Sequence, residues 1–470
     1  MLEFHKKKPK NPSKTEPEKR IKDFQEIYSQ FDKNDSVEQS SRCSQCGIPY
    51  CQIHCPLNNN IPDWLRYIAE GRLEEAYQIS ASTNAFPEVC GRVCPQDRLC
   101  EGNCVVEQAG FGAITIGNLE KYLTEIAWEK GWVKNLSSQN QFKQKVAIIG
   151  SGPAGMAASA YLTQNGYQVD VFEKNDRAGG LMIYGIPNFK LDKKIVERRT
   201  EWLLESGVKF NLNTEVGKNI SFQDLEKDYD AILIATGVYK ARQLDIDTSS
   251  VNNSIPALDF LIESNRTGLG DSPSNNKFLN AKNKNVVVIG GGDTAMDCVR
   301  TAIRQQAKEV TCLYRRNKEN MPGSAREVLN AEQEGIKFNW LSVPSKIISD
   351  NSTATSMTYK VAALGEVDES GRRKPVDTGV EKQIKSDLII QALGFEPEDL
   401  NHNFKTNIEL TSWKTVKVDF KKFQTSNPKI FAAGDIVRGA SLVVWAIHDG
   451  REVAKSIHNF LQSSKIKKAS

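Results

Sequence analysis

Eight of the ten cysteines lie between Cys43 and Cys104 and form the densest group of reactive side chains in the sequence. Their pattern is C-x2-C-x4-C-x3-C-P followed, 34 residues later, by C-x3-C-P-x4-C-x3-C. Such dense thiolates are typical of zinc or iron–sulfur sites. Structural zinc uses separated C-x2-C pairs, so single cysteines at varied intervals favour two iron–sulfur clusters. On spacing alone all eight cysteines are candidate ligands, and buried inert thiols are the remaining interpretation.

A glycine turn predicts a first nucleotide site. Residues 145–173 have the sequence KVAIIGSGPAGMAASAYLTQNGYQVDVFE, which predicts a strand, a G-x-G-x-x-G turn, a helix of small residues and a second strand. Such glycines form a tight turn and let the backbone approach a pyrophosphate at the helix N-terminus. Glu173 ends the second strand, where a ribose hydroxyl needs an acceptor. We therefore expect an adenosine without a 2′-phosphate.

A second glycine turn predicts a different nucleotide. Residues 285–297, NVVVIGGGDTAMD, contain a G-x-G-x-x-A turn, and the strand that follows ends in Arg315 and Arg316 instead of an acid. Guanidinium groups match phosphate oxygens, whereas an acid would repel a 2′-phosphate. This site is predicted to prefer NADPH. The alternative is that the two arginines are solvated at a strand end.

Several local patterns predict the elements that position these residues. Residues 61–80 have helical periodicity broken at Gly71, and 116–128 form a second helix candidate, whereas 133–144 is a polar linker. The strand YDAILIATG at 229–237 is echoed by DLIIQALG at 387–394, which suggests two related domains. Asp192 is expected to cap a helix, Ser324 and Glu327 to form a capping box, and Ser441 to cap a helix that reaches about Leu461.

The predicted fold class is α/β, with two Rossmann-like nucleotide-binding domains, the second inserted in the first, preceded by a small α-helical iron–sulfur domain. The expected boundaries are 1–143 for the helical domain with its basic tail, 144–283 and 396–470 for the two segments of the first nucleotide-binding domain, and 284–395 for the NADPH-binding domain. The family resemblance described below implies that the first nucleotide-binding domain binds FAD.

Composition restricts the function. The 470 residues carry 62 basic and 58 acidic side chains, so nothing points to nucleic acid as the main partner. The basic tail at 5–20 is expected to be a solvated, partly disordered arm. No apolar run could span a bilayer and no signal peptide is evident, so a cytoplasmic protein without structural disulfides is expected.

Seven motifs, in this order along the chain, resemble one family: GSGPAG with a following acid, RAGGL, YGIPNFKLDK, VIGGGDTAMDCV, YRR with MPGS, LGEVDESGRRKP and AAGDIVRGASLVVWAIHDGR. From about Cys43 to Arg451 the chain resembles the small (beta) subunit of bacterial NADPH-dependent glutamate synthase. Its cysteine module is also similar to the N-terminal part of dihydropyrimidine dehydrogenase. The resemblance implies FAD, NADPH and two 4Fe–4S clusters.

The resemblance also implies the site residues. The candidate FAD contacts are Gly150, Gly152, Pro153, Ala154, Gly155, Glu173, Gly179, Gly180, Leu181, Gly434 and Asp435. The candidate NADPH contacts are Gly291, Gly292, Asp293, Thr294, Ala295, Arg315 and Arg316. Gly237 and Gly394 end the two echoing strands and are further candidates, and Lys190 either approaches the FAD pyrophosphate or is solvated. One cluster would be held by Cys43, Cys46, Cys51 and Cys104, and the other by Cys55, Cys94, Cys100 and Glu120, with Cys90 left free.

The family implies an electron-input subunit that passes NADPH electrons to a large (alpha) subunit, which makes glutamate from glutamine and 2-oxoglutarate. Hydride transfer to a flavin needs stacking and no dedicated base, so no catalytic side chain is expected. Cys298 and Cys312 are isolated from each other in the sequence, which disfavours a redox-active disulfide as the electron exit. Two alternatives remain: an NADPH oxidoreductase serving another acceptor, such as a bacterial dihydropyrimidine dehydrogenase, and a non-catalytic zinc-bound scaffold.

Overall fold

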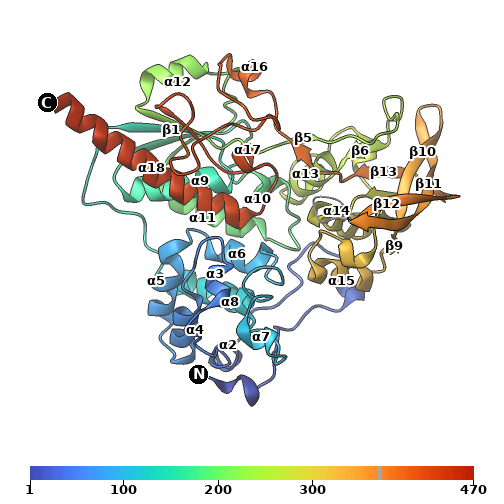
Figure 1. Ribbon diagram of the computed structural model, residues 1–470, viewed down its shortest axis with the longest axis horizontal. Helices are drawn as coiled ribbons and strands as arrows, with labels where there is room; N and C mark the ends of the chain where they lie inside the picture. Colours follow the sequence, from blue (N-terminus) through green and yellow to red (C-terminus); the bar gives the residue numbers. More distant parts are fainter. Residues whose placement is uncertain (368–372, 470) are drawn as a thin grey trace.

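The computed structural model describes residues 1–367 and 373–469, and it confirms the predicted fold class. A helical domain lies beneath two α/β domains that stand side by side (Figure 1). Part of the motif LGEVDESGRRKP, residues 368–372, lies outside the described residues. In the described part of the chain no helix is both long enough and apolar enough to cross a membrane.

The helical domain packs short helices around a core that includes Trp64, Leu65 and Leu119. Gly71, with a φ of +78°, separates α4 from α5, as the sequence predicts. The cysteines lie on or beside the short helices that connect the longer ones. The helices are α1 (Pro17–Arg20), α2 (Lys33–Ser41), α3 (Tyr50–Ile53), α4 (Ile61–Ala69), α5 (Leu73–Thr83), α6 (Pro87–Val93), α7 (Val105–Gln108) and α8 (Ile116–Glu129).

The first nucleotide domain is built on a parallel sheet with the strand order β15-β4-β1-β2-β3. Because β15 comes from the C-terminal part of the chain, the second domain is inserted within the first. The strands are β1 (Lys145–Ile149), β2 (Gln168–Phe172), β3 (Lys209–Asn211), β4 (Ala231–Ile234) and β15 (Ile430–Ala432). The helices are α9 (Pro153–Gln164), α10 (Leu181–Tyr184), α11 (Lys193–Glu205), α12 (Phe222–Asp228), α16 (Leu400–Phe404), α17 (Asp435–Arg438) and α18 (Val443–Ala469).

The second nucleotide domain repeats this topology in a parallel sheet with the order β6-β13-β7-β8-β9. β13 lies beside β7 as β4 lies beside β1, which explains the echo between their sequences. The strands are β6 (Ser254–Pro256), β7 (Asn285–Ile289), β8 (Glu309–Leu313), β9 (Lys337–Asn339) and β13 (Leu388–Gln391), with helices α13 (Ala257–Gly268), α14 (Asp293–Arg304) and α15 (Ala325–Gln333). An antiparallel pair, β5 (Lys240–Ala241) and β14 (Phe395–Glu396), links the two domains.

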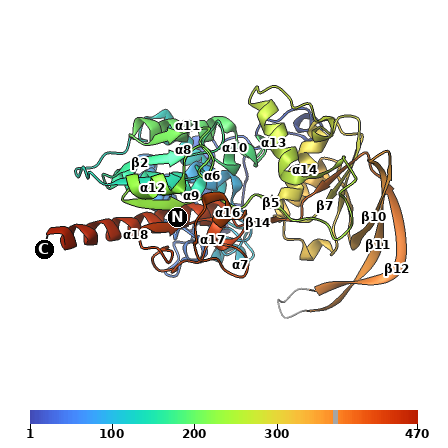
Figure 2. The ribbon, with the colours of Figure 1, turned by 90° about the horizontal axis from the view of Figure 1, so that it is seen from above.

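Two features of the second domain differ from the sequence-based expectation. Its sheet includes β6, which lies within the range 144–283 that the sequence places in the first nucleotide-binding domain. A three-residue strand without a glycine turn leaves little trace in the sequence, so its place in the second sheet is not predicted. An antiparallel sheet of β10 (Ser342–Asp350), β11 (Thr353–Val367) and β12 (Arg373–Lys385) is also added. Most of β12 is exposed and polar, so it lacks the apolar alternation that predicts strands. This sheet lies at the opposite end of the molecule from the free end of α18 (Figure 2).

The basic N-terminal tail at residues 5–20 is largely exposed, as expected, but it also makes specific contacts with the helical domain and with the second nucleotide domain. Lys14 donates to Gln333, and the Arg20 side chain is 2% exposed and paired with Glu334. The arm is held by buried charge pairing and hydrogen bonds instead of an apolar stripe. Composition therefore gives no indication of its order.

Candidate functional site

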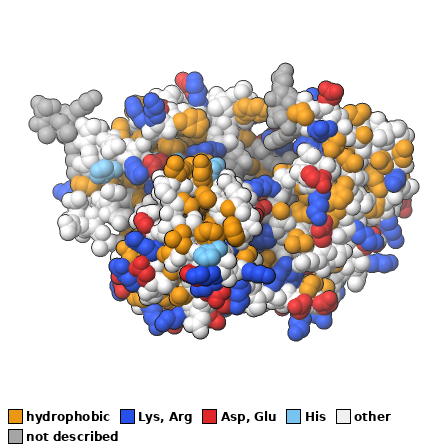
Figure 3. Space-filling view, turned by 60° about the horizontal axis from the view of Figure 1, so that its bottom comes forward, with side chains coloured by type: hydrophobic (Ala, Val, Ile, Leu, Met, Phe, Trp, Pro, Cys, Tyr) orange, Lys and Arg blue, Asp and Glu red, His pale blue; other side chains and the backbone are white. Residues whose placement is uncertain are grey.

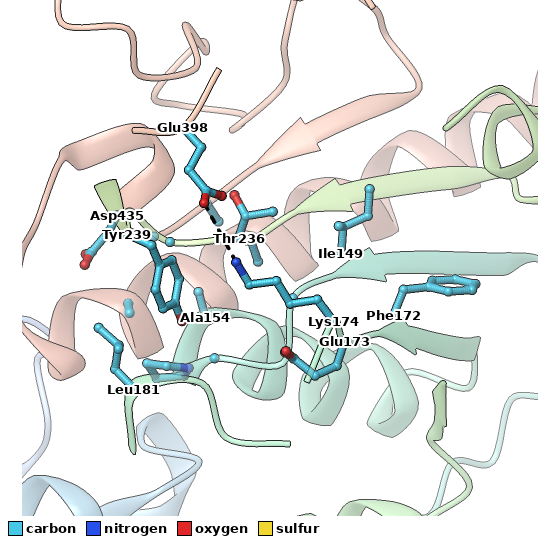
Figure 4. A pocket seen from close by; sticks show the side chains of 18 of the residues that line it. Ile149, Ala154, Phe172, Glu173, Lys174, Leu181, Thr236, Tyr239, Glu398 and Asp435 are labelled. Carbon is cyan, nitrogen blue, oxygen red and sulfur yellow. Dashed lines mark ion pairs between the residues drawn. The ribbon is translucent and has the colours of Figure 1, made fainter. Parts of the chain in front are cut away.

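An open cavity of about 1110 Å³, including its mouth, lies at the C-terminal ends of β1, β2, β4 and β15. In an open parallel sheet this edge is where nucleotides bind. Figure 4 shows the side chains that surround the cavity. Of the residues predicted to contact FAD or a nucleotide, those that line it are Gly150, Gly152, Pro153, Ala154, Glu173, Leu181, Gly237, Gly434 and Asp435.

The glycines of the first turn leave room for a ligand backbone. A Cβ on Gly152 would meet no atom within 4 Å, so the open side of this residue faces free space at the start of α9. A Cβ on Gly155 would lie 2.0 Å from the carbonyl oxygen of Gly150, which explains the close packing of helix on strand. Gly179 and Gly180 are not among the lining residues; they bring a second loop against the turn, where a Cβ on Gly180 would lie 2.7 Å from the Gly152 Cα. The turn therefore fits a pyrophosphate.

Glu173 is fixed within this cavity by its neighbours. The backbone N–H and the hydroxyl of Ser151 donate to Oε2 at 3.0 and 2.6 Å, and the backbone N–H and side-chain amide of Asn175 donate to Oε1 at 2.9 and 2.7 Å. A carboxylate offers about four acceptor positions, and these four bonds fill them. A ribose hydroxyl would therefore bind Glu173 in place of one of the present donors.

The cavity is also lined by residues that the sequence did not indicate. Lys174 Nζ lies 3.8 Å from Oε1 of Glu398, and this ion pair crosses the view of the cavity in Figure 4. The same amine lies 4.8 Å from the centre of the Tyr239 ring. Burial raises the pKa of Tyr239, so its hydroxyl stays protonated. These residues come from three segments that only the fold brings together, and no local pattern marks them.

The first turn of α18 lines the same cavity through Val443 and Ala446. The predicted cap differs: the Ser441 hydroxyl donates to Oδ1 of Asp435 at 2.6 Å, and the helix begins at Val443 and extends past Leu461. The half-buried Asp435 carboxylate therefore takes this hydroxyl in place of the start of the helix. Burial raises the pKa of Asp435, and the bond from Ser441 opposes that rise.

Lys190 lies outside the residues that line the cavity. Its amine is buried and pairs with Oδ1 of Asp297 on α14 at 2.7 Å. Burial alone would lower the pKa of Lys190, but Asp297 with Glu327 and Asp293 raises it. The charged amine thus joins the two nucleotide domains and is neither solvated nor at the first glycine turn.

The second glycine turn lies at the start of α14. A Cβ on Gly291 would lie 2.3 Å from the Tyr314 ring, whereas one on Gly292 would meet no atom within 4 Å. Asp293 accepts the backbone N–H of Ser324 at 2.9 Å, which holds the loop before α15 against the turn. Thr294 and Ala295 continue into the helix. The open side of Gly292 matches that of Gly152, so this turn also fits a pyrophosphate.

The two arginines at the end of β8 have different surroundings. Arg315 is exposed, whereas Nε of Arg316 donates to the carbonyl oxygen of Arg373 at 2.9 Å. Arg315 is therefore the freer guanidinium for a 2′-phosphate. Gly394, with a φ of +96°, follows β13 and accepts the backbone N–H of Arg242 at 3.0 Å, so it shapes the link between the domains.

The capping box expected at α15 does not form. The Ser324 hydroxyl donates to Asp97 Oδ1, and Oδ2 of the same carboxylate accepts the backbone N–H of Ala325. Glu327 instead pairs with Arg300 on α14. Asp97 belongs to the helical domain, so a carboxylate from another domain satisfies the start of this helix.

The clustered cysteines fall into two cavities. One is lined by Cys43, Cys46, Cys51 and Cys104. The other is lined by Cys55, Cys90, Cys94, Cys100 and Glu120. The fold thus brings together the two sets that the resemblance implies and adds Cys90 to the second set.

The donors in both cavities suit a bound metal cluster. Burial raises the pKa of Cys51 to about 12 and that of Cys55 to about 11, so thiolates there need a cation to displace the proton. Burial also raises the pKa of Glu120 to about 8, and Asn84 donates to this carboxyl group at 3.2 Å. Within the described residues no three histidine, cysteine, aspartate or glutamate side chains are placed to hold a single metal ion.

The cavity of Cys55, Cys94 and Cys100 adjoins each of the other two cavities. Val444 of α18 lines the second cysteine cavity, whereas Leu442 and Val443 line the cavity at the first glycine turn. Ile116 lines both cysteine cavities. Arg451 donates to the carbonyl oxygens of Leu57 and Thr83 and so ties α18 to the helical domain.

Comparisons with known proteins agree with this division of the chain. A family model described as dihydropyrimidine dehydrogenase domain II, 4Fe-4S cluster, matches residues 20–132, and one described as pyridine nucleotide-disulphide oxidoreductase matches residues 144–450. The chain is 51% identical over 467 residues to the glutamate synthase (NADPH) small chain of Azospirillum brasilense, covering 98% of this chain and 97% of that protein.

The chain belongs to the glutamate synthase small-chain family. It is also 45% identical over 460 residues to the small chain of Escherichia coli (strain K12), covering 97% of this chain and 96% of that one. Members of this family are NADPH-dependent flavin oxidoreductases with a 4Fe–4S domain, and the predicted cofactor types are confirmed. Mycobacterium tuberculosis FprA in complex with NADPH shares the fold, with a TM-score of 0.58 at 19% identity over 69% of this chain and 86% of that one.

Proposed function

We propose that this chain is the electron-input subunit of a glutamate synthase. It oxidises NADPH at FAD and delivers the electrons through two 4Fe–4S clusters to a large subunit that converts glutamine and 2-oxoglutarate to glutamate. Bound flavin accepts a hydride and can release the electrons singly, as clusters require. The protein's own residues bind the cofactors, orient them and shield them from water.

The succession of three adjoining cavities carries this proposal. The cavity at the first glycine turn adjoins the cavity of Cys55, Cys94 and Cys100 at the start of α18, and that cavity meets the one of Cys43 across Ile116. Such an order suits electrons that enter at the nicotinamide and leave through the helical domain.

The proposed ligands of the two clusters are residues that line the two cysteine cavities. Cys43, Cys46, Cys51 and Cys104 hold one cluster, while Cys55, Cys94, Cys100 and Glu120 hold the other, with Cys90 close by. The backbone at Gly152 would hold the FAD pyrophosphate, and Glu173 would accept a ribose hydroxyl. Arg315 and Arg316 receive the 2′-phosphate of NADPH.

An anaerobic absorption titration of the purified chain tests the electron-input role. Flavin bands should bleach with stoichiometric NADPH and not with NADH, above a broad brown iron–sulfur background. Iron analysis should give about eight iron atoms per chain if two 4Fe–4S clusters are bound. A flavin spectrum without that background would contradict the proposed exit through the helical domain.

Binding to the large subunit tests the partner. The chain, mixed with the glutamate synthase large subunit of the same organism, should form a complex that produces glutamate with NADPH. Failure to associate, together with intact NADPH oxidation, would instead favour another acceptor, such as the remaining part of a bacterial dihydropyrimidine dehydrogenase.

A further inference from the structure

Asp97 and Arg98 of the helical domain contact the loop at residues 321–325, which leads into α15 of the second nucleotide domain. Oδ1 of Asp97 accepts the hydroxyl of Ser324 at 3.1 Å, and Oδ2 accepts the backbone N–H of Ala325 at 3.2 Å. The guanidinium of Arg98 donates to a carbonyl oxygen of the same loop. Figure 3 turns the helical domain forward and shows Lys and Arg side chains along its junction with the second nucleotide domain. Directed hydrogen bonds thus join the two domains at this loop.

The same loop also contacts the second glycine turn. The backbone N–H of Gly323 donates to the carbonyl oxygen of Gly291 at 2.8 Å, and that of Ser324 donates to Oδ1 of Asp293 at 2.9 Å. A Cβ on Gly323 would lie 3.1 Å from the same Gly291 oxygen, so the approach is close. Ser324 therefore links the helical domain to the turn, because its hydroxyl binds Asp97 while its N–H binds Asp293.

The loop that carries Asp97 is itself firmly held. It lies between Cys94 and Cys100, which both line the second cysteine cavity. The side chain of Gln96 is 2% exposed, and its amide donates to two carbonyl oxygens of α6 at 3.2 and 3.1 Å. The carboxylate of Asp97 is therefore presented to the second domain from a fixed position.

The order of the second glycine turn decides how tightly a dinucleotide binds. Backbone N–H groups at the start of α14 would hold the pyrophosphate on the open side of Gly292. A site that is already in its binding conformation loses less conformational entropy when the ligand enters, so it binds more tightly. Contacts that hold the turn in place therefore contribute to affinity without touching the ligand.

We infer that Asp97 and Arg98 are positioning residues of the NADPH site, through which the helical domain sets the affinity of the second nucleotide domain for the pyrophosphate of the nucleotide. The inference rests on the proposed assignment of NADPH to the second glycine turn. Both residues act through the loop at 321–325, so the segment between two candidate cluster ligands also supports the site where electrons enter.

The test measures the binding of NADP⁺ and of 2′-AMP to the full chain carrying its cofactors, by isothermal titration calorimetry. NADP⁺ has the pyrophosphate, whereas 2′-AMP has only the adenosine and the 2′-phosphate. Asp97→Ala removes two hydrogen bonds to the loop, so it should raise the Kd for NADP⁺ about tenfold and leave the Kd for 2′-AMP unchanged. Arg315→Ala should raise both dissociation constants.

Asp32→Ala is the matched control. Asp32 is also an exposed aspartate of the helical domain, and its carboxylate also accepts a backbone N–H at the start of a helix, α2. The structure gives it no hydrogen bond to the second nucleotide domain within the described residues. Asp32→Ala should therefore leave both dissociation constants at the wild-type values.

Further readouts separate positioning from damage. In Asp97→Ala the flavin absorption, the iron content and the kcat for reduction of a small artificial acceptor should match wild type, with the change confined to the KM for NADPH. Ser324→Ala removes one bond to Asp97 from outside the cysteine segment, so it should weaken NADP⁺ binding even if Asp97→Ala disturbs a cluster. Added to Asp97→Ala, it should cause no further loss, because its partner is already absent.

The outcomes distinguish this inference from the proposed function. Wild-type affinity for NADP⁺ in both Asp97→Ala and Ser324→Ala would overturn the positioning role and leave the electron-input role intact. Equal weakening of NADP⁺ and 2′-AMP binding in Asp97→Ala, or equal weakening in Asp32→Ala, would also overturn it, since the effect would then not be specific to the turn. If Arg315→Ala binds both ligands as wild type does, the proposed nucleotide assignment is wrong and this inference fails with it.

Discussion

Nε of Arg20 lies 2.8 Å from Oε1 of Glu334, so the N-terminal arm is joined by a buried ion pair to a helix more than 300 residues away in the sequence. The same carboxylate receives Arg300 and Arg304 from α14. Together with Asp97 at the start of α15 and the pair of Lys190 with Asp297, this contact fixes the second nucleotide domain against the rest of the chain.

Replacing Arg20 by alanine should release the arm. Its guanidinium also donates to Asn330 and Gln333, and losing these charge-assisted bonds costs about 2 kcal/mol. Cleavage by trypsin at the lysines of the arm should therefore accelerate roughly 30-fold if opening is in rapid equilibrium. Glu18→Ala, at an exposed neighbour that is not a trypsin site, should leave the rate unchanged. Equal rates for Arg20→Ala and wild type would show that the arm is held elsewhere.

The glycine turns test which cofactor occupies which site. Gly152 and Gly292 have φ values of −67° and −88°, and an added Cβ at either meets no protein atom within 4 Å, so alanine should not disturb the fold. The methyl group would instead meet the pyrophosphate. Gly152→Ala should purify with at least tenfold weaker FAD retention. Gly292→Ala should keep its flavin and raise the KM for NADPH, and loss of FAD in both variants would contradict the assignment.

The unequal surroundings of the two arginines predict unequal effects on cofactor choice. Arg315 is exposed, whereas Arg316 is engaged by the carbonyl of Arg373. A charge-assisted bond to phosphate contributes about 1.5–3 kcal/mol, so Arg315→Ala should raise the KM for NADPH roughly 10- to 100-fold and leave that for NADH nearly unchanged. Arg316→Ala should have a smaller effect. Steady-state kinetics with both nucleotides measures these effects. A larger rise in the KM for NADPH in Arg316→Ala than in Arg315→Ala would contradict this assignment.

The glycine turns, Glu173 and the clustering of eight cysteines could be predicted from sequence because each depends on residue type at short spacing. The division of those cysteines into two sets came from the family resemblance, because spacing alone leaves all eight as candidates. Tyr239 and Glu398 could not, because they reach the first cavity from segments separated by the inserted domain. The same holds for Lys190 and Arg20, whose buried partners lie on α14 and α15. Ser324 and Glu327 had the right spacing for a capping box, but Asp97 and Arg300 offered each a stronger partner.

Glu327 should make the stability of the chain depend on acid pH. Burial alone would raise the pKa of Glu327, but Arg300, Lys190 and Arg326 lower it to about 2 from an ordinary value of 4.5. Because the folded-state pKa lies below the unfolded one, the pairing stabilises the fold fully above about pH 4.5, by about 3 kcal/mol, and this contribution is lost as the pH falls toward 2. The difference in the free energy of unfolding between wild type and Glu327→Gln should therefore be large at pH 7 and shrink below about pH 4.5. Measuring the difference cancels the titration of other carboxylates and the acid lability of the clusters. Glu332 is another carboxylate of α15 and forms a partly exposed pair with Lys318. Glu332→Gln should therefore change stability by less than about 1 kcal/mol. A wild-type minus Glu327→Gln difference that stays constant from pH 7 to pH 3 would show that this carboxylate is not held ionised by its basic neighbours.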